Sequence, residues 1–146
     1  MEGKKVEPKL KAMCLLLDDQ SRLLASQGYD HIKKQRFYRI LGGHLNPGED
    51  PADGVRREIR EEVNSEIDNL EFLEVIDNQF IYQGRPGHEI VHLYKGKLSR
   101  REIEDIPQFT FVDGPEVITA QWIKIDDIIH KKIIVYPHFD VKKYRV

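Results

Sequence analysis

The sequence predicts an α/β protein in which a mixed β-sheet is sandwiched between helices. Short apolar segments with strand-like alternation recur along the chain, and one segment has clear helical periodicity. Strand-like and helix-like segments alternate without a strict repeat, which favours helices on both faces of one sheet. Because the 146 residues contain no visible linker or internal duplication, residues 1–146 are expected to form a single domain.

Composition limits the classes of partner. The net charge is −2, from 23 basic and 25 acidic side chains, which provides no broad cationic surface for long nucleic acids or anionic lipids. No apolar stretch approaches the roughly 20 residues needed to span a membrane, and the N-terminus lacks an apolar signal core. The only cysteine, Cys14, lies in an apolar run and is expected to be a buried thiol. A cytoplasmic protein that acts on a small molecule is therefore expected.

The first half of the chain is predicted to contain three short strands. Residues 12–17 and 23–24 are expected to pair as a hairpin around the polar residues 18–21. Residues 28–36 are interpreted as a loop, and residues 37–41 as the next strand. The following segment, 42–48 (GGHLNPG), is rich in glycine and proline and is expected to form a shaped loop.

The clearest helix begins after this loop. Asp50 followed by Pro51 is typical of a helix start, with an N-cap acceptor and a proline in the first turn. Apolar residues then recur at helical spacing and predict a buried face made of Ala52, Val55, Ile59 and Val63. Asn64 tolerates the left-handed conformation that ends helices.

The second half is predicted to begin with a longer hairpin. Residues 70–80 and 89–98 alternate like strands and are separated by residues 83–87 (QGRPG), which suit a turn. After a looser segment with two prolines, residues 120–125 predict a last strand that includes Trp122, expected in the core. Residues 128–134 predict a short helix, and the apolar residues near the C-terminus suit either the core or a homodimer contact.

The predicted helix also has an acidic face. With about 100° per residue, Glu58, Glu61 and Glu62 cluster ~110° from the apolar face. Two carboxylates ~5 Å apart repel by ~3 kcal/mol at an effective dielectric constant of ~20, and a hard divalent cation between them would relieve this cost. A carbonyl of the glycine loop could join them as a ligand. The alternative is a solvated helix face on which Arg57 pairs with Glu61.

The spacing of these residues resembles the signature of the Nudix (MutT-like) hydrolase family. That signature is Gly, five residues, Glu, seven residues, Arg, Glu, an aliphatic, any residue, Glu, Glu, any residue, Gly and an aliphatic. This chain matches it at Gly43, Glu49, Arg57, Glu58, Ile59, Glu61 and Glu62. It departs at Asn64, where glycine is usual, and at Ser65, where an aliphatic is usual. Neither departure falls on a metal ligand of the family.

The resemblance implies an enzyme that uses Mg²⁺ or Mn²⁺ to hydrolyse a pyrophosphate bond. The substrate would be a nucleoside diphosphate linked to another group, such as a nucleotide sugar, a dinucleoside polyphosphate or a nucleoside triphosphate. The implied metal ligands are Glu58, Glu61, Glu62 and the carbonyl of Gly42, with Glu61 and Glu62 also acting in catalysis. Gly43, Glu49 and Arg57 would be structural, the last two as an ion pair.

Residues outside the signature supply further candidates. Glu89 is the leading candidate for an additional catalytic acid, and Glu116 is the next. His44 suits either a phosphate contact or a solvent-exposed loop position, and Tyr82 suits either stacking on a base or ordinary hairpin packing. His88 and His92 lie four apart but on a predicted strand, which disfavours a helical zinc pair.

Two other function classes compete with hydrolysis. A non-catalytic, nucleotide-binding regulatory module of the same fold would have no need to retain every metal carboxylate. An isomerase of small isoprenoid diphosphates on the same fold would place a cysteine in a cleft, whereas Cys14 lies in an apolar strand.

Overall fold

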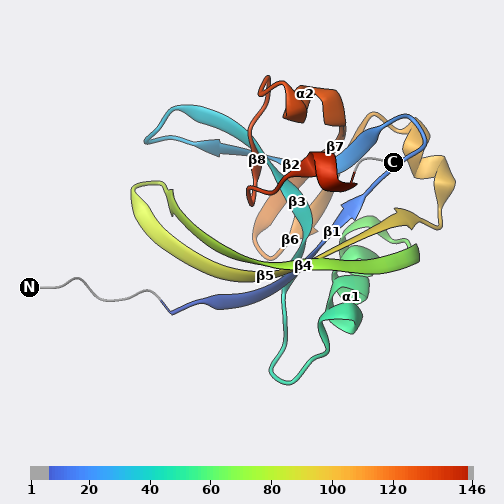
Figure 1. The fold of residues 1–146 in the computed structure, drawn as a ribbon, viewed down its shortest axis with the longest axis horizontal. Helices are drawn as coiled ribbons and strands as arrows, with labels where there is room; N and C mark the ends of the chain where they lie inside the picture. The colour runs from blue at the N-terminus through green and yellow to red at the C-terminus, as the bar shows by residue number, and fades with distance from the viewer. Residues whose placement is uncertain (1–6, 145–146) are drawn as a thin grey trace, which may run out of the picture.

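The computed structural model describes residues 7–144 and contains a mixed sheet with helices on both faces (Figure 1). The strands are β1 (Lys9–Leu16), β2 (Arg22–Asp30), β3 (Gln35–His44), β4 (Ile67–Tyr82), β5 (Arg85–Leu98), β6 (Gln108–Asp113), β7 (Glu116–Lys124) and β8 (Val135–Tyr136). The helices are α1 (Pro51–Val63) and α2 (Ile125–Ile129), with short 3₁₀ helices η1 (Arg101–Asp105) and η2 (Val141–Tyr144).

The strand order in the sheet is β4-β5-β1-β3-β2-β7-β6, with β8 paired to β3. β1 runs parallel to β5 and β8 runs parallel to β3, whereas the other pairs are antiparallel. The predicted hairpin between residues 12–17 and 23–24 is wrong, because β3 lies between β1 and β2. Only an isolated bridge between Leu17 and Leu23 joins the two segments directly.

Alternate residues of the central strands enter two separate cores, which confirms the predicted sandwich. On β1, Ala12, Cys14 and Leu16 pack with α1 on one face. Their neighbours Met13, Leu15 and Leu17 pack with α2 and η2 on the other. In Figure 1, α1 accordingly lies on the opposite side of the sheet from α2.

The helix α1 forms as its sequence predicts. The Asp50 side chain accepts hydrogen bonds from the backbone N–H groups of Ala52 and Asp53, and Pro51 is the first helical residue. Asn64 ends the helix at φ 56° and ψ 46°, the left-handed conformation. Val55, Ile59 and Val63 are buried, and Ala52 packs against the same core.

Several predicted loops are shorter than expected. β2 and β3 extend into both ends of the predicted loop 28–36, because the backbones of residues 28–30 and 35–37 pair with each other whatever the polarity of their side chains. β3 continues through Gly42 and Gly43 to His44, since these glycines pair with β1, so only 45–50 form the loop. The β4–β5 turn comprises Gln83 and Gly84 alone, both with positive φ.

The C-terminal third departs most from prediction. β6 was not predicted, because its alternation lies between two prolines, and it pairs with β7. The short helix is α2, which begins at Ile125 rather than 128. Val135 is buried in the core beside α2, and Ile133 and Phe139 are half-buried against the same core, whereas the homodimer contact stays a prediction.

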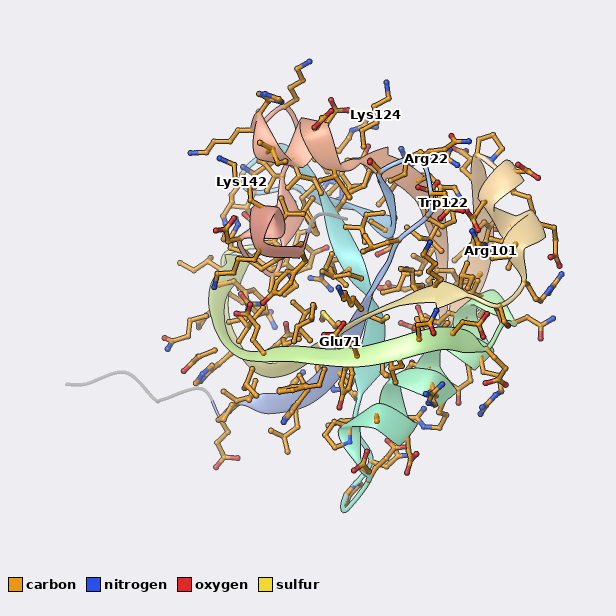
Figure 2. The ribbon with its side chains drawn as sticks, turned by 45° about the vertical axis from the view of Figure 1, so that its right-hand side comes forward. Arg22, Glu71, Arg101, Trp122, Lys124 and Lys142 are labelled. Carbon is orange, nitrogen blue, oxygen red and sulfur yellow. The ribbon has the colours of Figure 1, made fainter. Side chains whose placement is uncertain are left out.

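The tryptophan of β7 is a core residue, as predicted. Trp122 is 8% exposed, and its indole N–H donates to the backbone carbonyl of Ile103 at 3.1 Å. The guanidinium of Arg22 lies 5.3 Å from the ring centroid, and Figure 2 shows Arg22, Trp122 and Arg101 at the same end of the molecule. Within residues 7–144, no helix is both long and apolar enough to cross a bilayer.

Candidate active site

A cavity of about 230 Å³ lies between α1, the end of β3 and the β6–β7 hairpin. α1 contributes Glu58 and Glu62, and β3 contributes the backbone of Gly42 and Gly43. The β6–β7 hairpin contributes two more carboxylates, Asp113 and Glu116. Two cations, Lys11 of β1 and Arg39 of β3, also line it. Anionic and cationic groups therefore face a common space large enough for part of a small ligand.

Two glycines at the end of β3 allow close approach of neighbouring elements, Gly43 to α1 and Gly42 to β1. A Cβ atom at Gly43 would lie 2.5 Å from Cδ of Glu58, so this carboxylate lies directly against the Gly43 backbone. At Gly42, φ is +149° and a Cβ atom would lie 2.2 Å from the carbonyl oxygen of Ala12. A side chain at Gly42 would meet backbone at a positive φ and is excluded, whereas one at Gly43 would have to displace the Glu58 carboxylate.

Glu62 is the most perturbed carboxyl group of the cavity. Burial raises its pKa to about 9, and the neighbouring carboxylates of Glu58 and Asp113 contribute in the same direction. Burial also raises the pKa of Glu58. Among the described residues, no group donates a hydrogen bond to the buried Oε1 of Glu62. The site therefore holds a carboxylate that needs a cationic or protic partner.

Arg57 connects the helix to the preceding loop. Its Nε and Nη2 donate to Oε2 and Oε1 of Glu49 at 2.9 and 3.0 Å, a bidentate ion pair. Nη2 also donates to the carbonyl of His44 at 3.0 Å, and Nη1 lies 3.0 Å from Oε1 of Glu58. Hydrogen bonds from Arg57 lower the pKa of Glu49 to about 2. Arg57 thus joins the loop, the strand end and a cavity carboxylate.

The third acidic residue of the helix lies at the edge of this arrangement. The Glu61 side chain is 58% exposed, and its Oε1 lies 3.3 Å from Nη1 of Arg57. Glu58 and Glu62 line the cavity, whereas Glu61 forms the pair with Arg57, and metal binding by this face stays a prediction. In the described part of the chain, no three acidic, histidine or cysteine side chains are already grouped as a metal site.

Asp113 is a cavity residue that the sequence did not single out. It ends β6 and pairs in register with Glu116, and its charge contributes to the raised pKa values of both Glu58 and Glu62. A signal existed in the sequence VDGPE, where two acids flank a Gly-Pro turn before the last strand. Because β6 was not predicted, the sequence analysis did not show that Asp113 and Glu116 face each other across the β6–β7 pair.

Comparison with known proteins assigns this arrangement of loop, helix and carboxylates to a family. The family model described as "NUDIX domain" matches residues 7–142. The chain belongs to the Nudix family. This confirms the predicted identity as a Nudix hydrolase at the level of the family, and the fold class with it.

Individual Nudix relatives are distant. A curated relative from Bacillus methanolicus, described as a methanol dehydrogenase activator, is 27% identical over 128 residues, covering 83% of this chain. The chain spans 66% of the length of that relative. Two solved structures share the fold. One is a NUDIX hydrolase from Nitrosomonas europaea, with a TM-score of 0.57 and 16% identity, and the match covers 86% of this chain and 78% of that chain. The other is a MutT NUDIX hydrolase from Burkholderia pseudomallei, with a TM-score of 0.59 and 18% identity, and the match covers 82% of this chain and 85% of that chain.

A second cavity adjoins the carboxylate cavity of this Nudix domain. It lies between the β4–β5 hairpin and the chain around β3 and β8, and the two cavities share the side chains of Met13, Phe37, Arg39 and Tyr82. Glu89, the predicted further acid, lines this second cavity and not the first. Its Oε2 lies 2.6 Å from Nζ of Lys11, and its Oε1 accepts from Nδ2 of Asn78 at 3.2 Å.

The two predicted substrate contacts of the Nudix domain lie close to these cavities. His44 lines the carboxylate cavity, and burial together with nearby Lys11 lowers its pKa. An uncharged imidazole is thereby favoured, which contacts phosphate through N–H donation rather than as a cation. Tyr82 stands between the two cavities with its ring 5.9 Å from that of Phe37.

The cysteine and histidine predictions are consistent with a Nudix hydrolase. Cys14 is fully buried and burial raises the pKa of its thiol, so it is unsuited to proton transfer in a cleft. His88 pairs with Asp77 of the neighbouring strand, with Nε2 2.6 Å from Oδ1.

The donor set of the Nudix cavity fits a hard divalent cation. Glu58 and Glu62 supply carboxylate oxygens, one of them buried without a hydrogen-bond partner, and Gly42 lines the same cavity with its backbone. Oxygen ligands of this kind are those that Mg²⁺ prefers. A cation at this place would also offset the burial and the repulsion by Glu58 and Asp113 that together raise the pKa of Glu62.

Proposed function

We propose that this protein hydrolyses, with Mg²⁺ or Mn²⁺, the pyrophosphate bond of a nucleoside diphosphate linked to another group. The observation that carries the proposal is Glu62, whose pKa is raised to about 9 by burial and whose buried Oε1, beside Glu58, has no hydrogen-bond partner among residues 7–144. An ionised carboxylate at this position is costly unless a cation joins it. A bound metal ion would therefore explain why Glu58 and Glu62 lie together in this cavity.

Glu58, Glu62 and the carbonyl of Gly42 would hold the metal, with Glu61 adding its carboxylate from the rim. When bound, the metal neutralises the pyrophosphate and lowers the pKa of an attacking water. Arg57 holds Glu58 in place through the 3.0 Å contact of Nη1 with Oε1. Lys11 and Arg39 line the same cavity, and we propose that they contact phosphate oxygens of the substrate.

The roles of the remaining predicted residues follow from where they lie. His44 is proposed to donate a hydrogen bond to a phosphate oxygen, since it lines the cavity beside Lys11. Glu89 lines the second cavity, so it acts as a further catalytic acid only if the substrate extends into that cavity. A general base at Glu89 would affect turnover of every substrate equally, whereas a binding role would change which substrates are preferred.

A regulatory module is the second candidate function. The curated relative is described as an activator of another enzyme, and this name favours a partner-directed role for that protein. The crowding of Glu58, Glu62 and Asp113 argues against a regulatory role for this chain. A domain that binds a nucleotide without cleaving it would gain nothing from the repulsion between these carboxylates. Catalysis is therefore the function that the cavity supports best.

The decisive experiment follows phosphorus-containing products by ³¹P NMR with and without Mg²⁺. The substrates are nucleotide sugars, dinucleoside polyphosphates and nucleoside triphosphates. We expect metal-dependent cleavage of at least one class, and Glu62→Gln is expected to lower turnover by at least ~10²-fold. Glu66→Gln is the matched control, because Glu66 is exposed on the far side of Asn64 and pairs with Arg60. Equal turnover by both variants would refute the assigned role of Glu62.

A further inference from the structure

Arg39 of β3 brings a positive charge to the carboxylate cavity. Its side chain is half-buried and lines this cavity together with Lys11. Nζ of Lys11 lies 2.6 Å from Oε2 of the buried Glu89, whereas Arg39 forms no ion pair with any residue from 7 to 144. Because a half-buried charge is costly without a counter-ion, Arg39 is the better placed of the two cations to bind an anionic group of a ligand.

Two aromatic rings hold the guanidinium group of Arg39. Its Cζ lies 5.5 Å from the ring centroid of Phe37 and 5.4 Å from that of Tyr82, within the range of cation–π attraction. The two rings, which we call the aromatic clamp, are nearly perpendicular, with centroids 5.9 Å apart. A guanidinium group that stacks on rings keeps its N–H donors in one plane. The clamp therefore restrains Arg39 and leaves these donors available to a ligand.

The sheet fixes the Phe37 ring of the aromatic clamp. Phe37 is 4% exposed and pairs in register with Gly28 of β2. A Cβ atom at Gly28 would lie 2.5 Å from Cζ of Phe37, so the ring lies directly against the glycine backbone. The ring of Tyr136 packs against it at 5.4 Å and 76°. Arg39 follows Phe37 by two residues on β3, so both side chains project to the same face of the strand.

Tyr82, the second ring of the clamp, borders a space too small for a nucleobase. The second cavity has a volume of about 30 Å³, roughly the volume of one water molecule. The hydroxyl group of Tyr82 makes only long contacts, donating to the carbonyl of Tyr29 and accepting from Nε2 of Gln83, both at 3.4 Å. The closest charged group to its ring is therefore Arg39, which lines the larger carboxylate cavity beside it.

We infer that Arg39 is the principal phosphate-binding cation of the carboxylate cavity, and that Tyr82 is a positioning residue that acts through Arg39 and does not stack on a base. The inference rests on the proposed function and assigns roles within the same site. A guanidinium group can donate to two phosphate oxygens at once, which suits a pyrophosphate. Holding this group in place before the substrate arrives lowers the entropic cost of binding.

The test is calorimetric binding of methylenediphosphonate to the full chain with Mg²⁺. This probe has the two phosphorus centres of a pyrophosphate, a carbon bridge that is not hydrolysed, and no base. Arg39→Met is expected to weaken its binding at least ~10-fold, because a hydrogen-bonded charge is lost. Arg39→Lys, which keeps the charge without the planar fork, is expected between this variant and wild type.

The variants of Tyr82 separate a positioning role from a stacking role. Tyr82→Leu is expected to weaken binding of the diphosphonate ~3- to 10-fold, because the ring that attracts the guanidinium is lost. Tyr82→Phe keeps the ring and is expected to bind within ~2-fold of wild type. In the Arg39→Met background, Tyr82→Leu should add less than ~2-fold. Phe72→Leu is the matched control, because Phe72 is an exposed ring of the same strand that lines neither cavity.

Four results would overturn the inference: no binding of the diphosphonate to wild type, unchanged binding by Arg39→Met, unchanged binding by Tyr82→Leu, or additive losses in the double variant. Base stacking by Tyr82 predicts the third result, because the probe has no base. If Tyr82→Leu does not fold, Tyr82→Met replaces it in the same comparison. A chain that binds the diphosphonate through Arg39 but cleaves no nucleotide contradicts the proposed function alone. A chain that cleaves nucleotides while Arg39→Met binds the probe like wild type contradicts the inference alone.

Discussion

Arg57 and Glu49 form a bidentate ion pair, with Nε to Oε2 at 2.9 Å and Nη2 to Oε1 at 3.0 Å, that fastens the loop after β3 to α1. The same guanidinium reaches Glu58 and the carbonyl of His44. One side chain therefore aligns the loop, the strand end and a cavity carboxylate. Rigid alignment of this kind is what a site based on charge placement requires.

Arg57→Lys should weaken both the fold and the activity, because an ammonium group cannot replace the planar fork. The pKa of Glu49 is lowered to about 2 in the folded protein, below its ordinary 4.5. The stability contributed by this pair is therefore present above pH 4.5 and is lost as the pH falls towards 2. We expect the melting temperature of the variant to fall below that of wild type at pH 7, and the two curves to converge near pH 2. A constant difference across this range would contradict the assignment.

Glu62 should make the metal-free protein less stable as the pH rises. Its pKa is raised from 4.5 to about 9, so the folded state favours the protonated form and stability declines between these two values. Glu62→Gln cannot ionise and should show a flatter melting curve from pH 5 to 9. Saturating Mg²⁺ should stabilise wild type but not the variant, since binding to the folded state alone raises stability. A stabilising effect of Mg²⁺ on both would place the ion elsewhere.

Gly43→Ala should damage activity through Glu58. The added methyl group would lie 2.5 Å from Cδ of Glu58 and must displace this carboxylate. Displacement by about 1 Å is expected to cost at least ~10-fold in kcat/KM. A double-mutant cycle with Glu58→Ala provides the check: if the clash with Glu58 is the cause, the second substitution adds little to the first. Fully additive losses would indicate a separate role for Gly43.

Asp113→Asn should weaken divalent-metal binding. Asp113 lines the carboxylate cavity and contributes to the raised pKa values of Glu58 and Glu62, so its charge acts on the same space. Removing the charge is expected to raise the Kd for Mn²⁺, measured by electron paramagnetic resonance, about 3- to 10-fold. Asp105→Asn, in the exposed η1 turn, should leave it unchanged. Equal affinities of both variants would remove Asp113 from the metal environment.

Local features of the molecule were predictable because they depend on neighbouring residues. The N-cap Asp50, the buried stripe of α1 and the left-handed Asn64 all arise from interactions within one helix, and the structure contains each of them. The β4–β5 hairpin was recognised for the same reason, although its turn is shorter than expected. The wrong predictions concern strands whose neighbours come from other segments of the chain. The sequence does not reveal that β3 separates β1 from β2, or that β6 pairs with β7.

The amino-acid order therefore determined the family signature, the acidic face of α1 and the pairing of Arg57 with Glu49, all contained within a single loop and helix. Tertiary structure alone decided that Asp113 joins Glu58 and Glu62, that Glu61 stays at the rim, and that Glu89 faces an aromatic cavity beside Lys11. The physical reason is that a strand presents its side chains to one face or the other according to register. Register is set by non-local pairing and by burial of the whole sheet, not by the residues of one segment.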